Sequence, residues 1–421
     1  MYILSGRRRD EFLACPQLVR VGEGTEPPEL LLKTTTLSAK YLLRSVKLRV
    51  VVLRVRGYLL YGLLFDDGEA EELVRWSLFE EPYELESLRA LSSHASMRLA
   101  VFNEAAVCVA FGECAVTSAP ASLLALCEGA EPYPFRPDGV DSAMTSEADA
   151  RLGQLLKGAL SDQDGIFVDL LPPSTWVPIK NHFITNNAAR GLVSLFDSDE
   201  GGQQEALAHW LVDELSPDGA TRSPQVDERG SVRELTDILL THRHGNILFE
   251  SKSLSMLSRP SLPSRDRLAQ QIVGHINKAA RQLAGAARNI AAGLSIMDRK
   301  GNLVRVDRIE PPHLVILIPE LSLLAGRGEV GIPFFQTVMQ NTRGFLHILD
   351  PSELLRIVQA ASMISARGKT TTSMMAFDHW LMKRAEHFVE IGHPYFHVLL
   401  RFDEDPPTDQ RAGDKSSVPQ R

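Results

Sequence analysis

The sequence predicts an α/β protein in which a strand-rich α+β N-terminal part precedes a mixed sheet flanked by helices. Residues 47–56 and 58–65 are rich in β-branched and aliphatic side chains on either side of a glycine, as the two strands of a hairpin are. In the second half, short apolar segments alternate with segments of helical spacing, which is typical of a sheet covered by helices. Residues 313–319 are apolar almost throughout, as a central strand covered on both faces would be.

Shifts in composition divide the chain into two domains, a linker and a tail. Residues 1–127 are expected to form a strand-rich recognition or assembly domain. Residues 128–145, rich in proline, glycine and acidic side chains over most of their length, are the best candidate for a linker. Residues 146–402 are expected to form the second domain, and the polar, proline-containing residues 403–421 to form a disordered tail.

Apolar side chains at helical spacing predict the helices of the second domain. Residues 205–215 place Leu207, Trp210 and Leu211 on one face. A long helix is expected over residues 265–294, with an apolar stripe along one side. The other expected elements are strands over 302–309, 313–319 and 345–350 and helices over 333–341, 351–361 and 371–391.

The chemistry of the chain is concentrated in a predicted hairpin with strands over 232–241 and 246–252. Asp237 interrupts the first strand, whereas Glu250 and Lys252 end the second and share a face, because side chains alternate along a strand. Two acids and a lysine at the end of an apolar hairpin carry a desolvation cost unless something pairs them. Carboxylate oxygens suit a hard cation such as Mg²⁺, and the lysine could hold a nucleophilic water beside it.

Asp237, twelve intervening residues and then Glu250-Ser251-Lys252 resemble the PD-(D/E)xK nuclease superfamily, which has the restriction-endonuclease-like fold. The resemblance covers roughly residues 200–319. It implies that Asp237 and Glu250 bind Mg²⁺, with Mn²⁺ as a substitute, and that the main-chain carbonyl of Ser251 is a further ligand. It also implies that Lys252 orients the attacking water or helps to deprotonate it.

The same resemblance implies a metal-binding role for a glutamate on the helix before the hairpin. Glu205 occupies that place and would bind a second ion or a water of the first. The alternative is an ordinary acid of a first helical turn, favoured there by the helix dipole. Thr236 stands where the literal motif has a proline, which is a departure from the pattern.

Short motifs recur by chance, and the sequence offers competing matches. Asp298-Arg299-Lys300 also has an acid two positions before a lysine, but it is wholly polar and followed by a glycine, so it favours a turn. Pro217-Asp218 lies in a polar loop before a glycine and favours a β-turn. For the hairpin set itself, the alternative is a surface hairpin closed by a salt bridge.

The long helix after the hairpin belongs to a locally basic segment of a chain whose net charge is −8. The resemblance places this helix beside the catalytic strands, which makes Lys278, Arg281 and Gln282 the candidate contacts to substrate phosphates. A solvated basic face is the alternative. The overall acidity means that any nucleic-acid contact must depend on such local patches.

Composition restricts the remaining classes of function. No apolar run reaches the length of a membrane span, and the N-terminus does not resemble a secretory signal. The four cysteines show no CxxC pair, which favours reduced thiols in a cytoplasmic protein over a disulfide framework or a zinc site.

The function expected from these observations is a Mg²⁺-dependent nuclease that hydrolyses phosphodiester bonds. DNA is favoured over RNA, and an endonuclease over an exonuclease. By analogy, the domain arrangement is reminiscent of effector nucleases in anti-phage defence. The alternative is a non-catalytic nuclease-like subunit of a larger complex. A third reading is a nuclease held inactive until a protein partner or a second copy of the chain joins it.

Overall fold

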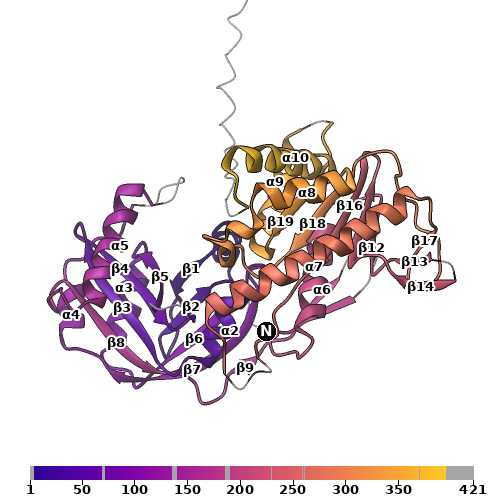
Figure 1. Ribbon diagram of the computed structural model, residues 1–421. Coiled ribbons are helices and arrows are strands. Elements are labelled where there is room, and N and C mark those ends of the chain that lie inside the picture. Colours follow the sequence, from indigo (N-terminus) through magenta and orange to yellow (C-terminus); the bar gives the residue numbers. More distant parts are fainter. Residues whose placement is uncertain are drawn as a thin grey trace, which may run out of the picture.

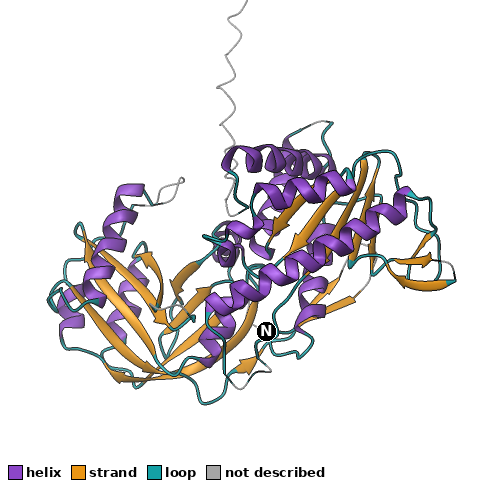
Figure 2. Ribbon diagram, in the orientation of Figure 1, coloured by secondary structure: helices purple, strands orange, loops and turns teal. Residues whose placement is uncertain are grey.

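The computed structural model describes residues 4–68, 72–134, 140–184, 190–228, 230–257, 259, 261–368 and 370–394. Two large sheets lie side by side, the first formed by the indigo-to-magenta half of the chain and the second by the pink-to-orange half, with helices against both (Figures 1 and 2). The mixed α/β class is therefore confirmed, whereas the restriction-endonuclease-like assignment remains a prediction. No helix in the described residues is long and apolar enough to cross a bilayer.

The first sheet has the order β1-β2-β6-β7-β8-β3-β4-β5, with β9 paired to β7. Only the β2–β6 pair is parallel among the described strands. The predicted hairpin is β3 and β4, and Arg56 and Gly57 between them both have positive φ, as a tight two-residue turn requires. The strands are β1 Leu18–Val21, β2 Glu29–Lys33, β3 Leu48–Val55, β4 Tyr58–Phe65, β5 Leu73–Leu78, β6 Ser96–Phe102, β7 Cys108–Ser118, β8 Gly165–Leu171 and β9 Val177–Pro178.

The domain boundary expected at residues 128–145 is wrong. Helix α5 (Ser142–Leu156) lies beyond that segment, yet its apolar side packs on Val51 and Leu53 of β3. Strand β8 then inserts between β7 and β3, so the first sheet is incomplete without it. A proline-rich composition predicted a break in the chain, but the tertiary pairing of β8 carries the first unit to about residue 178. The other helices of this half are α1 Gly6–Ala14, α2 Thr36–Arg44, α3 Pro82–Ala90 and α4 Ser122–Cys127.

The second sheet has the order β12-β15-β16-β18-β19 and is mixed. Strands β12, β15 and β16 are antiparallel neighbours, whereas β18 and β19 join in parallel. Helices α6, α9 and α10 cover one face and α7 and α8 the other. The strands are β12 Gly219–Arg222, β15 Ile238–His242, β16 Gly245–Ser251, β18 His313–Leu317 and β19 Phe345–Leu349, and the helices are α6 Glu200–Asp213, α7 Arg265–Ala291, α8 Ile332–Thr342, α9 Pro351–Arg367 and α10 Ser373–Ile391.

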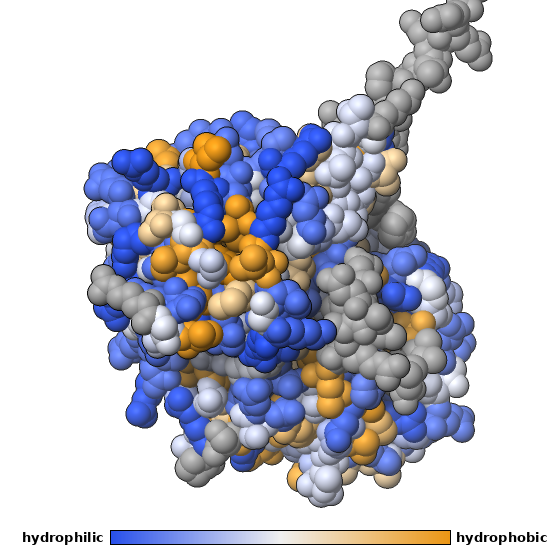
Figure 3. Space-filling model, turned by 90° about the vertical axis from the view of Figure 1, so that its right-hand side faces the viewer, coloured by the Kyte–Doolittle hydropathy of each residue, from blue (hydrophilic) through white to orange (hydrophobic). Residues whose placement is uncertain are grey.

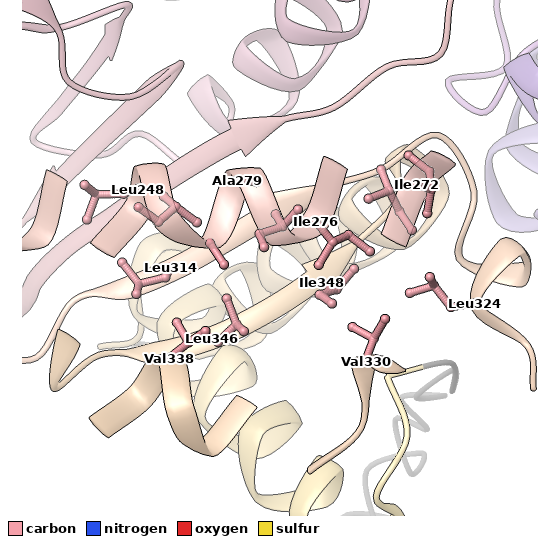
Figure 4. Packing of buried hydrophobic residues seen from close by; sticks show 14 of the residues in the cluster. Leu248, Ile272, Ile276, Ala279, Leu314, Leu324, Val330, Val338, Leu346 and Ile348 are labelled. Atoms are coloured by element: carbon pink, nitrogen blue, oxygen red, sulfur yellow. The ribbon is translucent and has the colours of Figure 1, made fainter. Parts of the chain in front are cut away.

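Helix α7 forms where the apolar stripe predicted it. Ser264 caps its first turn by accepting the backbone N–H of Arg267. Ile272, Ile276 and Ala279 lie against Leu248, Leu314, Leu346 and Ile348 of the sheet (Figure 4). Because α7 connects β16 to the parallel strand β18, it is the crossover that a parallel pair requires.

Two predicted strands differ from the structure. The segment 232–241 is divided into β14 (Ser231–Glu234) and β15, because the N–H of Leu235 turns away to donate to the Pro224 carbonyl. Strand β14 joins β13 (Gln225–Glu228) and β17 (Ile296–Met297) in a small separate sheet, while β10 (Asn181–Ile184) and β11 (Arg190–Val193) form another. Residues 302–309 form no strand. The expected tail, residues 403–421, lies outside the described residues.

Helix α2 joins the two halves of the molecule. Its Leu37 and Tyr41 belong to the core beneath α7, and the Tyr41 hydroxyl donates to the Pro263 carbonyl. Lys40 is almost fully buried and pairs with Glu200 at the start of α6. A hydrogen bond and ion pairs among buried groups therefore fix the second sheet against the first.

A second buried ionic contact lies next to α2. The Arg265 guanidinium pairs with both Asp67 and Glu320, and Glu320 also accepts the Thr35 hydroxyl at 2.7 Å. Positive charge on Arg265 and hydrogen bonds hold the pKa of Glu320 below its ordinary value, although burial acts in the opposite direction. The interface between the two halves is thus charged and fully desolvated.

Four side chains tie α10 to the strand ends farthest from the hairpin acids. Asp378 Oδ1 lies 3.2 Å from His313 Nε2 and 3.7 Å from His242 Nε2. His313 Nδ1 lies 2.9 Å from His347 Nε2. Burial, the nearby His313 and the charge of Arg384 lower the pKa of His347 well below its ordinary value. His347 is therefore neutral in the folded protein.

We expect Lys40→Met to lower the free energy of unfolding by about 3 kcal/mol, because it leaves the Glu200 carboxylate buried without its cation. Urea denaturation measures the change. Lys383→Met is the matched control, since Lys383 pairs with Glu386 at 2.7 Å on the surface and should leave stability nearly unchanged. Equal effects of the two variants would contradict the role of α2.

We expect stability to decrease as the pH falls below about 6.5, because the unfolded chain then protonates His347 while the folded protein keeps it neutral. Its contribution is complete above the unfolded pKa and decreases as the pH approaches the lowered folded value, at up to about 1.4 kcal/mol per pH unit. Urea denaturation across this range measures it. His347→Gln should reduce the acid sensitivity, whereas the exposed His387→Gln should leave it unchanged.

Candidate functional site

The structure brings Asp237, Glu250 and Lys252 together at neighbouring strand ends. Ile238 of β15 pairs with Phe249 of β16, so Asp237, one residue earlier, lies beside Glu250, one residue later. The Asp237 carboxylate accepts the backbone N–H of Ser251 at 2.6 Å. Lys252 Nζ donates to Glu250 Oε2 at 2.7 Å. The three side chains predicted from the hairpin therefore form one cluster.

Both carboxylates of this cluster are held in a setting that resists ionisation. Burial, and then the negative charge of Asp237, raise the pKa of Glu250 to about 7, although Lys252 opposes the shift. Burial also raises the pKa of Asp237, and the hydrogen bond from Ser251 opposes it. Glu234 at the end of β14 adds negative charge against both groups. The cluster thus has more buried negative charge than Lys252 alone offsets.

The backbone holds the cluster in register with the central strand. The N–H of Lys252 donates to the Leu317 carbonyl at 2.7 Å, which extends the parallel β16–β18 ladder past Ser251. Gln204 of α6 donates through Nε2 to Ser251 Oγ at 2.9 Å and to the same Leu317 carbonyl at 3.2 Å. The Ser251 side chain is therefore used to dock α6, while its carbonyl remains a predicted ligand.

Glu205 lies at the edge of the cluster. Burial, and then the charge of Asp237, raise the pKa of Glu205, which shows that the two carboxylates are near each other. Arg222 at the end of β12 is its ion-pair partner, at 3.4 Å. Helix α6 begins five residues earlier, at Glu200, so Glu205 is in the second turn rather than the first. The helix-dipole explanation for this acid therefore weakens.

The arrangement does not by itself enclose a metal ion. Within the part of the chain that the structure describes, no three His, Cys, Asp or Glu side chains are grouped closely enough to hold one. Asp237 and Glu250 nonetheless supply oxygen donors with a surplus of negative charge, which fits a hard divalent cation. Glu205, paired with Arg222, does not complete a three-carboxylate set here.

The candidate phosphate contacts lie on the solvent side of α7. Lys278, Arg281 and Gln282 are all exposed. Burial and then the positive charges of Lys252 and Lys278 lower the pKa of His275, which places Lys278 on the side of α7 nearest the cluster. For Arg281 and Gln282 the structure gives no contact with the cluster.

Sequence patterns missed several residues that complete this environment. Gln204, Arg222, Glu234 and His275 approach the cluster from four separate elements. None forms a motif with Asp237 at fixed spacing, so only the fold could identify them. Gln204 is adjacent to Glu205 in the chain, which is the one local signal available.

A pocket lies next to the cluster, between α2 and α6. Its lining includes Lys40, Asn103, Gln204 and Ser253, but not Asp237, Glu250 or Lys252. Ser251 points to the face opposite Glu250 and Lys252, and Gln204 follows it there. The carboxylate cluster and this pocket are therefore separate features that share a wall.

Comparisons with known proteins add little to this picture. No family model matches the chain, and no curated protein matches it. A search of solved structures returned SfsA from Pyrococcus furiosus in complex with Ca²⁺, at 13% identity and a TM-score of 0.17, over 72% of this chain and 88% of that one. A score this low shows only a weak structural neighbour. The candidate site therefore depends on the geometry of this chain alone.

Proposed function

We propose that this chain is a metal-dependent nuclease that hydrolyses phosphodiester bonds of nucleic acid. The observation that carries the proposal is the meeting of Asp237, Glu250 and Lys252 at adjacent strand ends, with two buried carboxylates and one lysine. The order of elements also supports it: α6, then β12, β15 and β16, then α7 and the parallel β18. This is the helix, strand, helix, strand order that the resemblance to PD-(D/E)xK nucleases implies.

Asp237 and Glu250 would hold the metal ion, Mg²⁺ or Mn²⁺, with the carbonyl of Ser251. When bound, the ion supplies charge stabilisation to phosphate oxygens and makes a bound water easier to deprotonate. Binding would also relieve the repulsion that now raises the pKa of both carboxylates. The fit is thus one of donor type and charge.

Lys252 would act on the water rather than on the ion. Its ammonium group now pairs with Glu250, which holds it on the same side of the strand as both acids. A lysine in this place can orient the attacking water and take part in moving its proton. Glu205, with Arg222 beside it, would position a further water or a second ion.

The finer choices follow the sequence argument. DNA is preferred over RNA as the substrate and internal cleavage over cleavage from ends. A role as a defence effector is carried by analogy with the superfamily alone.

A second candidate function is a non-catalytic nuclease-like subunit. The observation that favours it is that Glu205 and Glu250 already have cationic partners, Arg222 and Lys252, so the cluster is partly neutralised without metal. Such a subunit would bind a partner and leave nucleic acid uncut. Cleavage and metal-binding measurements separate the two functions.

We expect Glu250→Gln to raise the free energy of unfolding at pH 8 without divalent ions by about 1–2 kcal/mol. The folded pKa of about 7 lies above the unfolded value, so the destabilising charge is present above pH 7 and absent near pH 4. The gain should therefore shrink as the pH is lowered toward 5, roughly the range set by these pKa values.

Mn²⁺ should raise the melting temperature of the wild-type protein and have less effect on Glu250→Gln, because ligands that bind only the folded state stabilise it. Glu86→Gln, which alters an exposed acid of the first half, is the control and should respond like wild type. An equal Mn²⁺ response in all three proteins would exclude Glu250 as a ligand.

We expect the wild-type protein to cut supercoiled plasmid in Mg²⁺ or Mn²⁺ but not in EDTA. Lys252→Ala and Asp237→Asn should each reduce the rate by at least about 100-fold, the scale of a lost acid–base or ligand group. Linear duplex, single-stranded DNA and RNA tested in parallel would identify the substrate.

Lys157→Ala is the matched control for that assay, since Lys157 is exposed on the first half. Circular dichroism confirms that each variant is folded. Cutting that survives in Lys252→Ala and Asp237→Asn would place the activity elsewhere. Absence of cutting on every substrate, in either metal, would favour the non-catalytic subunit.

A further inference from the structure

Helix α7 and the loop after it form an exposed basic surface. It consists of seven side chains that are all exposed to solvent: Lys278, Arg281, Arg288, Arg299, Lys300, Arg305 and Arg308. Between residues 278 and 308 the only acidic side chains are Asp298 and Asp307, so this segment has a net charge of +5 in a chain of net charge −8. The surface is therefore an electrostatic exception in this protein.

No carboxylate neutralises this basic surface by a direct ion pair among the described residues. Asp298 instead accepts the backbone N–H groups of Lys300 and Asn302, and Asp307 accepts those of Ile309 and Glu310. Exposed cations elsewhere do have partners, such as Arg56 with Glu147 at 2.6 Å and Lys383 with Glu386 at 2.7 Å. The basic surface thus presents charge that intramolecular contacts leave available.

Two glycines on the outer side of α7 indicate close approach by another molecule. Gly274 and Gly285 lie well inside a 27-residue helix, where glycine weakens the helix relative to alanine. An added Cβ would meet nothing within 4 Å at Gly274 and only the end of Arg288, at 3.9 Å, at Gly285. Packing inside this chain therefore does not require either glycine.

The glycines and the cations of α7 occupy the same side of the helix. At about 100° per residue, Gly274, Lys278, Arg281, Gly285 and Arg288 fall within a strip of about 80° that faces away from the apolar stripe. Bare backbone alternates with positive charge along this strip. A long polyanion could lie against it closely.

The basic surface is linked to the candidate site at two places. Lys278 adjoins His275, whose pKa also responds to Lys252. Arg299 donates to Ser223 Oγ at 2.7 Å, and the Ser223 N–H donates to the Asp237 carbonyl at 2.7 Å. A chain of phosphates that crosses the basic surface would therefore pass near the carboxylate cluster.

Figure 3 looks onto the end of the molecule where β13, β14 and β17 lie, and hydrophilic side chains there surround an apolar patch. Leu303 and Ile309, from the loop after α7, are 76% and 88% exposed. The loop folds back on α7, because Arg308 donates to the carbonyls of Ile290 and Leu294 at its C-terminal end. The loop cations are thus held beside Arg288.

We propose that the basic surface binds the phosphodiester backbone of nucleic acid and delivers it to the carboxylate cluster. The proposal rests on the proposed function and adds the route of the substrate. Phosphate contacts release counterions, so binding should weaken steeply as salt rises. Because backbone contacts carry no base information, binding should be independent of sequence.

The test is fluorescence anisotropy with a labelled random-sequence duplex and the matching single strand, in EDTA so that no cutting occurs. Affinity is measured over a range of KCl concentrations. Arg281→Ala/Arg288→Ala and Arg299→Ala/Lys300→Ala should each weaken binding and lower the slope of log affinity against log salt. The expected loss is roughly 0.9 per phosphate contact on duplex and 0.7 on single strands, so the slopes identify the preferred form.

Arg7→Ala/Arg56→Ala is the matched control, because it removes the same charge from exposed arginines of the first half. It should leave the slope unchanged. Gly274→Ala/Gly285→Ala is a second variant with an unusual expected signature: a higher melting temperature together with weaker binding. A merely structural role for these glycines would not produce that combination.

The outcomes separate this inference from the proposed nuclease. Binding by wild type with equal slopes in the surface and control variants would overturn the route, even if cleavage is observed. Absence of salt-dependent binding to either nucleic acid would overturn it as well. Reduced binding in the surface variants, without any cleavage by wild type in Mg²⁺, would support the basic surface and exclude the nuclease.

Discussion

The burial of Glu250 beside Asp237 is the constraint on which the candidate site depends. Two carboxylates at the ends of neighbouring strands repel each other and lose hydration, so their pKa values rise. The protein offsets only part of this cost, through the Lys252 ammonium and the Ser251 N–H. A fold maintains such an arrangement at a cost in stability, which is common where chemistry or ligand binding takes place.

The rest of the molecule holds that constrained hairpin in place. Gln204 fixes α6 to the end of β16, and β18 continues the ladder through the N–H of Lys252. Helix α2 then locks the first half against both, through the buried contact between Lys40 and Glu200. The first sheet is therefore part of the support of the site, because its position is set by desolvated charges that cannot slide.

Helix α7 serves two environments at once. Its inner side supplies Ile272, Ile276 and Ala279 to the core, and its outer side carries Lys278, Arg281 and Arg288. The apolar stripe explains why the helix forms and where it packs. The outer side has no such structural explanation, since its cations lack ion-pair partners and its glycines lack neighbours. That contrast is what points to an external polyanion.

The sequence alone determined features whose cause is local: the β3–β4 hairpin, the stripe of α7, the apolar β18 and the Asp237, Glu250 and Lys252 set. Alternation and helical periodicity are properties of neighbouring residues, so they can be recognised without the fold. Only the tertiary structure decided that β8 belongs to the first sheet, that residues 232–241 are two strands, and that Arg222, Glu234 and His275 approach the acids. These depend on pairing between distant segments, where burial and hydrogen bonding outweigh composition, as the mistaken linker at 128–145 demonstrates.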